Sequence, residues 1–267
     1  MSRILSVCLL ATLALPDLAQ ARDIRLSGSS TIAPVMLEIG KLFEASHPEI
    51  RIFVETGGSG KGLVDLRKGL VDIAMVSREM TEEEADLQSH PIAYDGIAAL
   101  VPADNPLSDL SDEALRAIFT GRMRNWSELG GPDQPIVVVA KGEGRATSEV
   151  FNAYLGLTPD QIKGDLVAAE NAQMIKTVSV TLGSIGYVSI GAALLDIGYG
   201  VPVKLIPLGE VPPTADHVAD GSYGAVRPLN LVTQGSPPAD IAELIAFSQS
   251  AEVAEIIRAL TYVPVRP

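Results

Sequence analysis

The sequence has little of several residue types, and each shortage excludes a class of protein. The 267-residue chain has a single cysteine, so it can form no internal disulfide bond and no cysteine-based zinc site. It has 20 Lys and Arg residues against 33 Asp and Glu residues, a formal net charge of −13 without a basic cluster. This balance argues against a nucleic-acid partner, because nucleic-acid binding needs Lys and Arg to displace phosphate counterions. Aromatic residues make up only 4%, yet a hydrophobic share of 47% is typical of a folded chain.

Long apolar runs are also scarce, and the clearest one lies at the start of the chain. Residues 1–21 combine a basic Arg3, an apolar run over 4–15 and the small-x-small pattern Ala19-Gln20-Ala21. This pattern predicts a secretory signal peptide, since the run is too short to span a bilayer. Cys8 lies inside the run rather than at its end, where a lipid-modified cysteine would stand. We therefore expect a mature, soluble protein that begins near Arg22 and is exported without a lipid anchor.

From residue 22 onward, apolar patterns of strand and helix type alternate. Strands are predicted at 22–27, 50–54 and 72–76, each followed by a helix, the third of which would open with the capping box Thr81 and Glu84. A second α/β unit follows, with strands at 92–101, 136–140 and 186–189. This alternation favours an α/β fold in which helices cover a largely parallel sheet.

Four loops of small polar residues follow strands in this pattern, and three of them clearly open a helix. They are Ser29-Ser30-Thr31, Gly57-Gly58-Ser59-Gly60, Ser77-Arg78 and residues 141–148. Helix N-termini offer unpaired N–H donors and partial positive charge, and ligands of open α/β sheets bind at the carboxyl ends of strands. Any one loop alone is most simply a helix cap. Four together favour a site for a small tetrahedral oxyanion, which Arg78 and Arg145 could grip with two hydrogen bonds each.

Nucleotide and enzyme functions have weaker support. Residues 55–62 lack the first glycine and the final Ser or Thr of a Walker loop. The histidines, His47, His90 and His217, are scattered and show no metal-ligand spacing, and no G-x-S-x-G nucleophile motif is present. We therefore expect no catalytic residues, no metal and no cofactor.

At the four loops the sequence resembles the periplasmic phosphate-binding proteins of Pst-type ABC importers, in their shorter bacterial form. The matching stretches span nearly the whole mature chain, and their combination is more specific than any single one. They are LSGSSTIAPVM at 26–36, ETGGSGKGLVDLRKGLVDIAMVSREM at 55–80, AYDGIAALVPADNPLSDLS at 93–111, AIFTGRMRNWSELGG at 117–131, SIGYVS at 184–189 and YGAVRPLNLVT at 223–233.

The resemblance implies a two-lobed, type II binding-protein fold with two chain crossovers between the lobes. We expect residues 22–98 and 202–267 to form the first lobe and residues 99–201 the second. By this similarity Ser30 and Thr31, with Ser59, Ser77 and Arg78, bind phosphate from the first lobe.

The loop before the fourth helix would then close over the ligand from the second lobe. The family usually has Arg, three residues and Ser-Gly-Thr there, and this chain has Lys141 and Arg145-Ala146-Thr147. Thr147 therefore follows the family pattern, while Arg145 and Lys141 are assigned on the physics of anion binding. Further candidates are the neighbouring residues Ser29, Gly60, Ala146 and Ser148.

The expected function is capture of inorganic phosphate and its delivery to a membrane ABC permease by a monomeric carrier. Phosphate keeps a proton at neutral pH and sulfate does not, so a selective site needs an acceptor for that proton. Asp95 is a candidate acceptor, and a hinge turn before Gly96 is the alternative role for it. A carrier of sulfate or molybdate, a phosphate sensor and a secreted phosphatase on the same fold remain alternatives.

Overall fold

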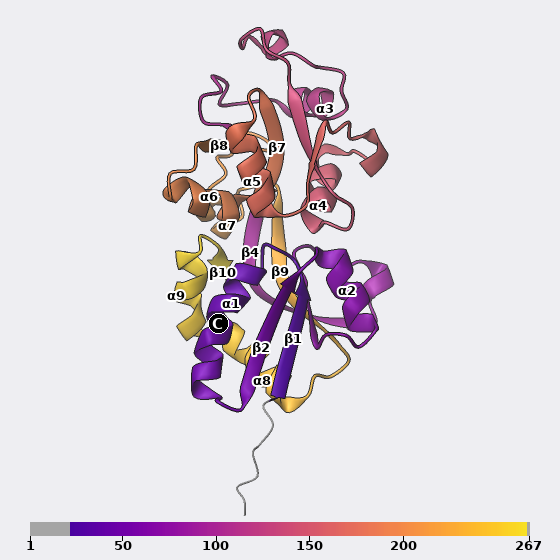
Figure 1. Cartoon of the computed structure of the whole chain (residues 1–267), viewed down its shortest axis with the longest axis vertical. Coiled ribbons are helices and arrows are strands. Elements are labelled where there is room, and N and C mark those ends of the chain that lie inside the picture. The colour runs from indigo at the N-terminus through magenta and orange to yellow at the C-terminus, as the bar shows by residue number, and fades with distance from the viewer. Residues whose placement is uncertain (1–21, 266–267) are drawn as a thin grey trace, which may run out of the picture.

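The alternating pattern builds two α/β lobes, one above the other in Figure 1, in a computed structural model that describes residues 22–265. The signal peptide predicted at 1–21 lies outside the described residues. The first lobe contains β1 (Arg22–Gly28), α1 (Ala33–Ser46), β2 (Ile50–Thr56), α2 (Ser59–Arg67), β3 (Ile73–Val76), the 3-10 turn η1 (Glu82–Glu84), α8 (Ala239–Ser248), α9 (Ala251–Ala259) and β10 (Val263–Pro264).

The second lobe is formed by the middle of the chain. It contains α3 (Asp112–Phe119), η2 (Trp126–Leu129), β5 (Val137–Lys141), α4 (Ala146–Leu155), η3 (Pro159–Gln161), β6 (Leu166–Ala168), α5 (Asn171–Val180), β7 (Ser184–Ser189), α6 (Ile190–Gly198), β8 (Val203–Ile206) and α7 (Ala215–Ala219). Two long strands, β4 (Leu87–Pro102) and β9 (Val226–Gln234), run from one lobe toward the other (Figure 1). The two expected chain crossovers are therefore confirmed.

The strands form one connected sheet in the order β2-β1-β3-β9-β4-β7-β5-β6, with β8 and β10 also paired to β4. The pairs β1–β2, β1–β3, β5–β6 and β5–β7 are parallel, while β9 and β4 pair antiparallel with their neighbours. In β4 and β9, Asp95 lies directly opposite Arg227. This charged pair therefore sits where the chain passes between the lobes.

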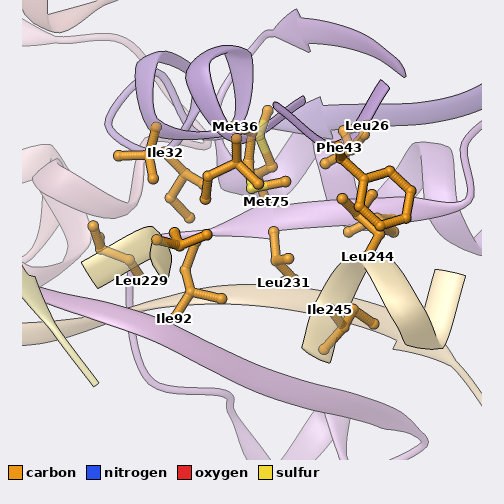
Figure 2. Packing of buried hydrophobic residues seen from close by; sticks show 14 of the residues in the cluster. Leu26, Ile32, Met36, Phe43, Met75, Ile92, Leu229, Leu231, Leu244 and Ile245 are labelled. Carbon is orange, nitrogen blue, oxygen red and sulfur yellow. The ribbon is translucent and has the colours of Figure 1, made fainter. Parts of the chain in front are cut away.

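The first lobe has a core on each face of its sheet. All four residues of β3 are buried, as expected for a strand covered on both sides. Ile73 and Met75 pack with the apolar face of α1 and with α8 and α9, as Figure 2 shows around Met75. Ala74 and Val76 point to the other face, where they pack against Leu63 and Leu66 of α2.

The packing corrects the predicted lobe boundary. Residues 202–225 were expected in the first lobe, but β8 pairs with residues 99–102 of β4, and Ile206, Leu208 and Tyr223 belong to the second lobe's core. The chain returns to the first lobe only through β9. A run of strand-type residues does not reveal which lobe it joins, because both lobes offer a sheet edge.

The third helix predicted after Thr81 is also shorter than expected. The capping box between Thr81 and Glu84 is present, but it opens only the 3-10 turn Glu82–Glu84. The chain then enters β4 at Leu87, because residues 87–91 pair with β9. Among residues 22–265, no helix has the length and apolar character needed to cross a membrane.

Candidate functional site

Four helices begin around one small cavity between the lobes. The loops before α1 and α2 reach it from the first lobe, and the loops before α4 and α5 reach it from the second. None of these four helices has a side-chain hydrogen bond at its N-cap, whereas α3, α6 and α7 are capped by Ser111, Ser189 and Thr214. Helices α8 and α9 also lack a cap. The partial positive charges of the four helix N-termini therefore all act on the cavity, where they favour an anion.

The cavity is small and polar. The centre of a water-sized sphere can move within a volume of only about 10 Å³ inside it. It is lined by Ser29, Ser30, Thr31, Gly58, Ser59, Ser77, Lys141, Arg145, Ala146, Thr147 and Ala169. Among residues 22–265, the lining contains hydroxyls and basic side chains and no carboxylate, so it suits a compact anion of a few atoms and not a nucleotide.

The first lobe supplies a fixed set of hydroxyls. Ser29 Oγ donates to Ser77 Oγ at 2.9 Å, and its oxygen accepts the Thr31 N–H at 3.1 Å. Ser59 Oγ accepts the N–H of Ser77 at 3.2 Å. All four side chains are buried. These bonds join the loops after β1, β2 and β3, so that side of the cavity is preorganised.

Arg227 of β9 stands behind this set and connects it to the second lobe. Its guanidinium donates to Thr31 Oγ1 at 3.1 Å, to Ser77 Oγ at 3.3 Å and to Thr147 Oγ1 at 2.9 Å. The carboxylate of Asp95 holds it at 2.8 Å, and both side chains are 1% exposed. Asp95 also accepts the N–H of Gly191 at 3.1 Å. Asp95 therefore aims Arg227 at three hydroxyls, two from one lobe and one from the other.

The second lobe contributes two further cations. Lys141, at the end of β5, is buried, and its Nζ donates to Asn171 Oδ1 at 3.1 Å. Burial, with smaller effects of the positive charges of Arg227 and Arg145, lowers the pKa of Lys141 to about 7. Arg145 precedes α4, and its Nη1 is ion-paired with Glu170. Its Nε is buried and has no hydrogen-bond partner among residues 22–265.

The lobes also touch each other directly around the cavity. Asn171 Nδ2, from α5, donates to Thr31 Oγ1 at 2.9 Å, and the N–H of Gly60 donates to the carbonyl of Gly144 at 3.2 Å. Gly58 has a φ of +92°, and a Cβ there would lie 2.7 Å from the Gly144 oxygen. Only glycine permits both this backbone conformation and this approach. The structure is therefore in a closed arrangement of the lobes.

The cavity brings together most of the residues predicted from the sequence. Ser30, Thr31, Ser59, Ser77, Arg145 and Thr147 line it, as do the further candidates Ser29, Lys141 and Ala146. Four candidates do not line it. Gly60 makes the cross-lobe bond, Ser148 hydrogen-bonds Tyr187, Asp95 holds Arg227, and Arg78 is described next.

The guanidinium of Arg78 is engaged by carboxylates. It donates to both oxygens of Glu84 at 2.7 and 2.8 Å, and its Nε lies 2.6 Å from a carboxylate oxygen of Glu149 in the second lobe. The bond to Glu84 raises the pKa of Arg78, although burial opposes it. In this closed arrangement Arg78 links the lobes and does not line the cavity. Its loop position alone could not reveal these two acidic partners.

Metal binding has no support in the described part of the chain. Within residues 22–265, no three His, Cys, Asp or Glu side chains gather as metal ligands would. The cations and hydroxyls around the cavity are themselves donors to an anion.

Comparison with known proteins places the chain in a family. A family model described as a PBP superfamily domain matches residues 16–252. The phosphate-binding protein PstS of Bacillus subtilis is 30% identical over 248 residues, which cover 91% of this chain and 81% of that protein. The chain belongs to the PstS-type phosphate-binding proteins of the PBP superfamily.

Solved structures of similar proteins agree with the PstS-type fold. A putative phosphate ABC transporter substrate-binding protein with bound phosphate from Clostridium perfringens superposes with a TM-score of 0.85 at 28% identity, covering 92% of this chain and 100% of that one. An ABC-type phosphate transport receptor from Vibrio cholerae gives a TM-score of 0.73 at 32% identity, covering 91% and 100%. The two-lobed fold expected from the sequence is therefore confirmed.

Sequence reasoning missed two residues beside this PstS-type cavity. Arg227 lies in the matching stretch at 223–233 but was not predicted as a site residue, and neither was Asn171. The available signal for Arg227 was that it is the single charged residue of the strand Val226–Gln234. A charged residue in a buried strand needs a partner of opposite charge or a ligand, and here Asp95 is that partner.

Proposed function

We propose that this chain captures inorganic phosphate between its two lobes and delivers it to an ABC importer. The observation that carries the proposal is the closed polar cavity, in which four helix N-termini, buried hydroxyls and the basic side chains of Lys141 and Arg145 converge. The family relationship and the phosphate-bound relative from Clostridium perfringens support phosphate as the anion. The carrier releases its ligand chemically unchanged.

The ligand-binding residues follow from this proposal. Ser30, Thr31, Ser59 and Ser77 bind phosphate from the first lobe, and Arg145 and Thr147 bind it from the second, together with exposed N–H groups of the helix starts. Lys141 and Ser29 contribute further donors. Arg227 supplies positive charge from behind and keeps Thr31 and Thr147 in place. Arg78 acts by stabilising the closed form.

Binding and closure occur in sequence. An open form first binds phosphate on the preorganised first lobe, and hinge bending in β4 and β9 then brings the second lobe over it. The contacts of Asn171 with Thr31 and of Gly60 with Gly144 form only on closure. Only the closed form docks productively on the permease.

The export route and assembly state belong to the same proposal. The sequence of residues 1–21 directs secretion to the periplasm, where cleavage releases the chain as a soluble monomer. Its partner is an ABC permease in the inner membrane. Mass spectrometry of the exported protein checks the first step, with an unlipidated N-terminus near Arg22 expected.

Calorimetric titration of the mature protein with phosphate, arsenate, sulfate and molybdate tests the function. One phosphate per chain, bound more tightly than sulfate and molybdate at neutral pH, is expected. Tighter binding of sulfate or molybdate would assign the protein to another oxyanion. The absence of a carboxylate from the cavity lining is the one observation that favours this second candidate.

A further inference from the structure

In the described part of the chain, the site has no acidic group positioned to accept the proton of a bound phosphate. Among residues 22–265, no Asp or Glu lines the cavity, and Asp95 stands outside the lining with its carboxylate held by Arg227 and the N–H of Gly191. Serine and threonine hydroxyls can accept a hydrogen bond, but they accept one as readily from water and do not repel an unprotonated anion. A preference for phosphate over sulfate therefore needs another source.

Two basic side chains line the cavity among residues 22–265, and of these Arg145 is paired with Glu170 while Lys141 has no ion-pair partner. Its Nζ has Asn171 Oδ1 as its hydrogen-bond partner, so other Nζ positions remain for a ligand. The charged groups around it come from three elements: Arg227 on β9, Arg145 before α4 and Glu170 before α5. Arg227 and Glu170 are already paired, with Asp95 and Arg145 respectively. On β7, Tyr187 bonds the backbone N–H of Lys141 and not its amine.

We propose that Lys141 distinguishes phosphate from sulfate by sharing the ligand's own proton. The inference rests on the proposed function. With Lys141 uncharged, its Nζ lone pair accepts the O–H of monohydrogen phosphate while one of its hydrogens stays on Asn171. The proton can stay on the phosphate oxygen or move to the Lys141 nitrogen. In both cases phosphate and Lys141 share one proton, and binding takes up none from solvent. Sulfate has no such proton, so an uncharged Lys141 can offer it only one remaining N–H, and the lone pair of the amine repels the dianion.

The two ligands should then differ in how their affinity depends on pH. Sulfate binds best to the ammonium form of Lys141. The proposal requires that Lys141 is already buried in its own lobe before the ligand enters, so that the ammonium form is lost as the pH rises through about 7. Each sulfate bound above this pH must therefore take up one proton, and its affinity should fall about tenfold per pH unit. Monohydrogen phosphate brings its own proton, so its affinity should stay nearly constant.

The test is calorimetric titration of the mature wild-type protein with sulfate and with phosphate between pH about 7.5 and about 9. Over this range dissolved phosphate is mainly the singly protonated dianion. The expected result is a loss of sulfate affinity of about 30-fold with a phosphate affinity that changes less than about threefold. Repeating the titrations in buffers of different ionisation enthalpy should reveal uptake of about one proton with sulfate and almost none with phosphate.

Substitution of the lysine gives a second, independent readout. Lys141→Arg carries a permanent charge and no lone pair, so it should bind sulfate equally at both pH values and lose most of the preference for phosphate. Lys141→Met has neither charge nor a basic lone pair and should bind sulfate weakly at every pH. Lys163→Arg, at an exposed position of the same lobe, should behave like wild type.

The outcomes separate this inference from the function on which it rests. If no phosphate binds at any pH, the proposed function fails and the inference falls with it. If phosphate binds but sulfate affinity changes less than about threefold over the range, or sulfate does not bind even at pH about 6, the role of Lys141 is refuted. The same holds if Lys141→Arg keeps the pH dependence of the wild type.

Discussion

The Arg145→Ala variant tests whether the second lobe grips the anion through a charged side chain. The side chain of Arg145 lines the cavity and is only 17% exposed, so solvent screens it weakly. Nη1 is held by Glu170, which leaves the unpartnered Nε and the rest of the guanidinium for the ligand. A hydrogen bond between charged groups contributes about 1.5–3 kcal/mol, so its loss should weaken phosphate binding roughly 10- to 150-fold.

The ion pair with Glu170 moves the expected loss toward the upper end of this range. Once Arg145 is removed, the carboxylate of Glu170 is left near the anion without its cation. Adding Glu170→Gln to Arg145→Ala should therefore restore part of the affinity, to within roughly tenfold of wild type. Arg145→Lys keeps the charge but loses the planar fork, and should fall between wild type and Arg145→Ala.

Titration calorimetry measures the phosphate affinity of the wild type, Arg145→Ala, Arg145→Lys and the Arg145→Ala/Glu170→Gln double variant. Arg122→Ala, at an exposed position of the same lobe, is the control. Thermal unfolding without phosphate should be similar for all of them, because Arg145 lies at the cavity and its ion pair with Glu170 is partly exposed. Binding by Arg145→Ala within twofold of wild type would refute the reasoning. The second lobe would then hold phosphate through Thr147 and backbone N–H groups alone.

Three further substitutions test the closed form and its ion pairs. Glu149→Gln removes the ion pair between Arg78 and Glu149 that joins the lobes. Because Glu149 is 43% exposed, this ion pair is weak, and phosphate should dissociate at most about fivefold faster in stopped-flow experiments. A much larger loss for Arg78→Ala with no effect of Glu149→Gln would instead indicate that Arg78 contacts the ligand. Gly58→Ala should weaken phosphate binding more than tenfold in a titration, because the added Cβ would collide with Gly144 when the lobes close. Gly69→Ala is the control: Gly69 also has a positive φ, +66°, but a Cβ there would have no atom within 4 Å, so the affinity should stay unchanged. The hydrogen bond from Arg78 lowers the pKa of Glu84 below its usual value of 4.5, so the pair stabilises the fold fully above that pH and less as the pH falls through the lowered pKa. The difference in unfolding free energy between wild type and Glu84→Gln, measured in urea, should therefore shrink from pH about 6 to about 3. A difference that stays constant over this range would contradict the prediction.

Local sequence signals predicted much of the site. The loops at residues 29–31, 57–60 and 141–148 could be identified because short hydroxyl residues and glycines at strand ends have few structural alternatives. The matching stretches also predicted the two-lobed fold. In these loops, the donors for an anion and the helix start that they belong to lie within a few residues of each other in the sequence.

The remaining features depend on residues that are distant in sequence. Asp95 and Arg227 are 132 positions apart and meet only because β4 and β9 pair in one register. Arg78 was placed at the ligand by its loop, yet Glu149 from the other lobe determines where its guanidinium lies. Pairing across lobes cannot be inferred from spacing along one chain, and for the same reason residues 202–225 were assigned to the wrong lobe.

A crystal structure of the mature protein with phosphate tests the central claim most directly. The account predicts one phosphate in the cavity, with oxygens within hydrogen-bond distance of Thr31 and Ser59 of the first lobe, of Arg145 and Thr147 of the second, and of Lys141 Nζ. Phosphate bound at another surface, or held in an open cleft by the first lobe alone, would contradict it.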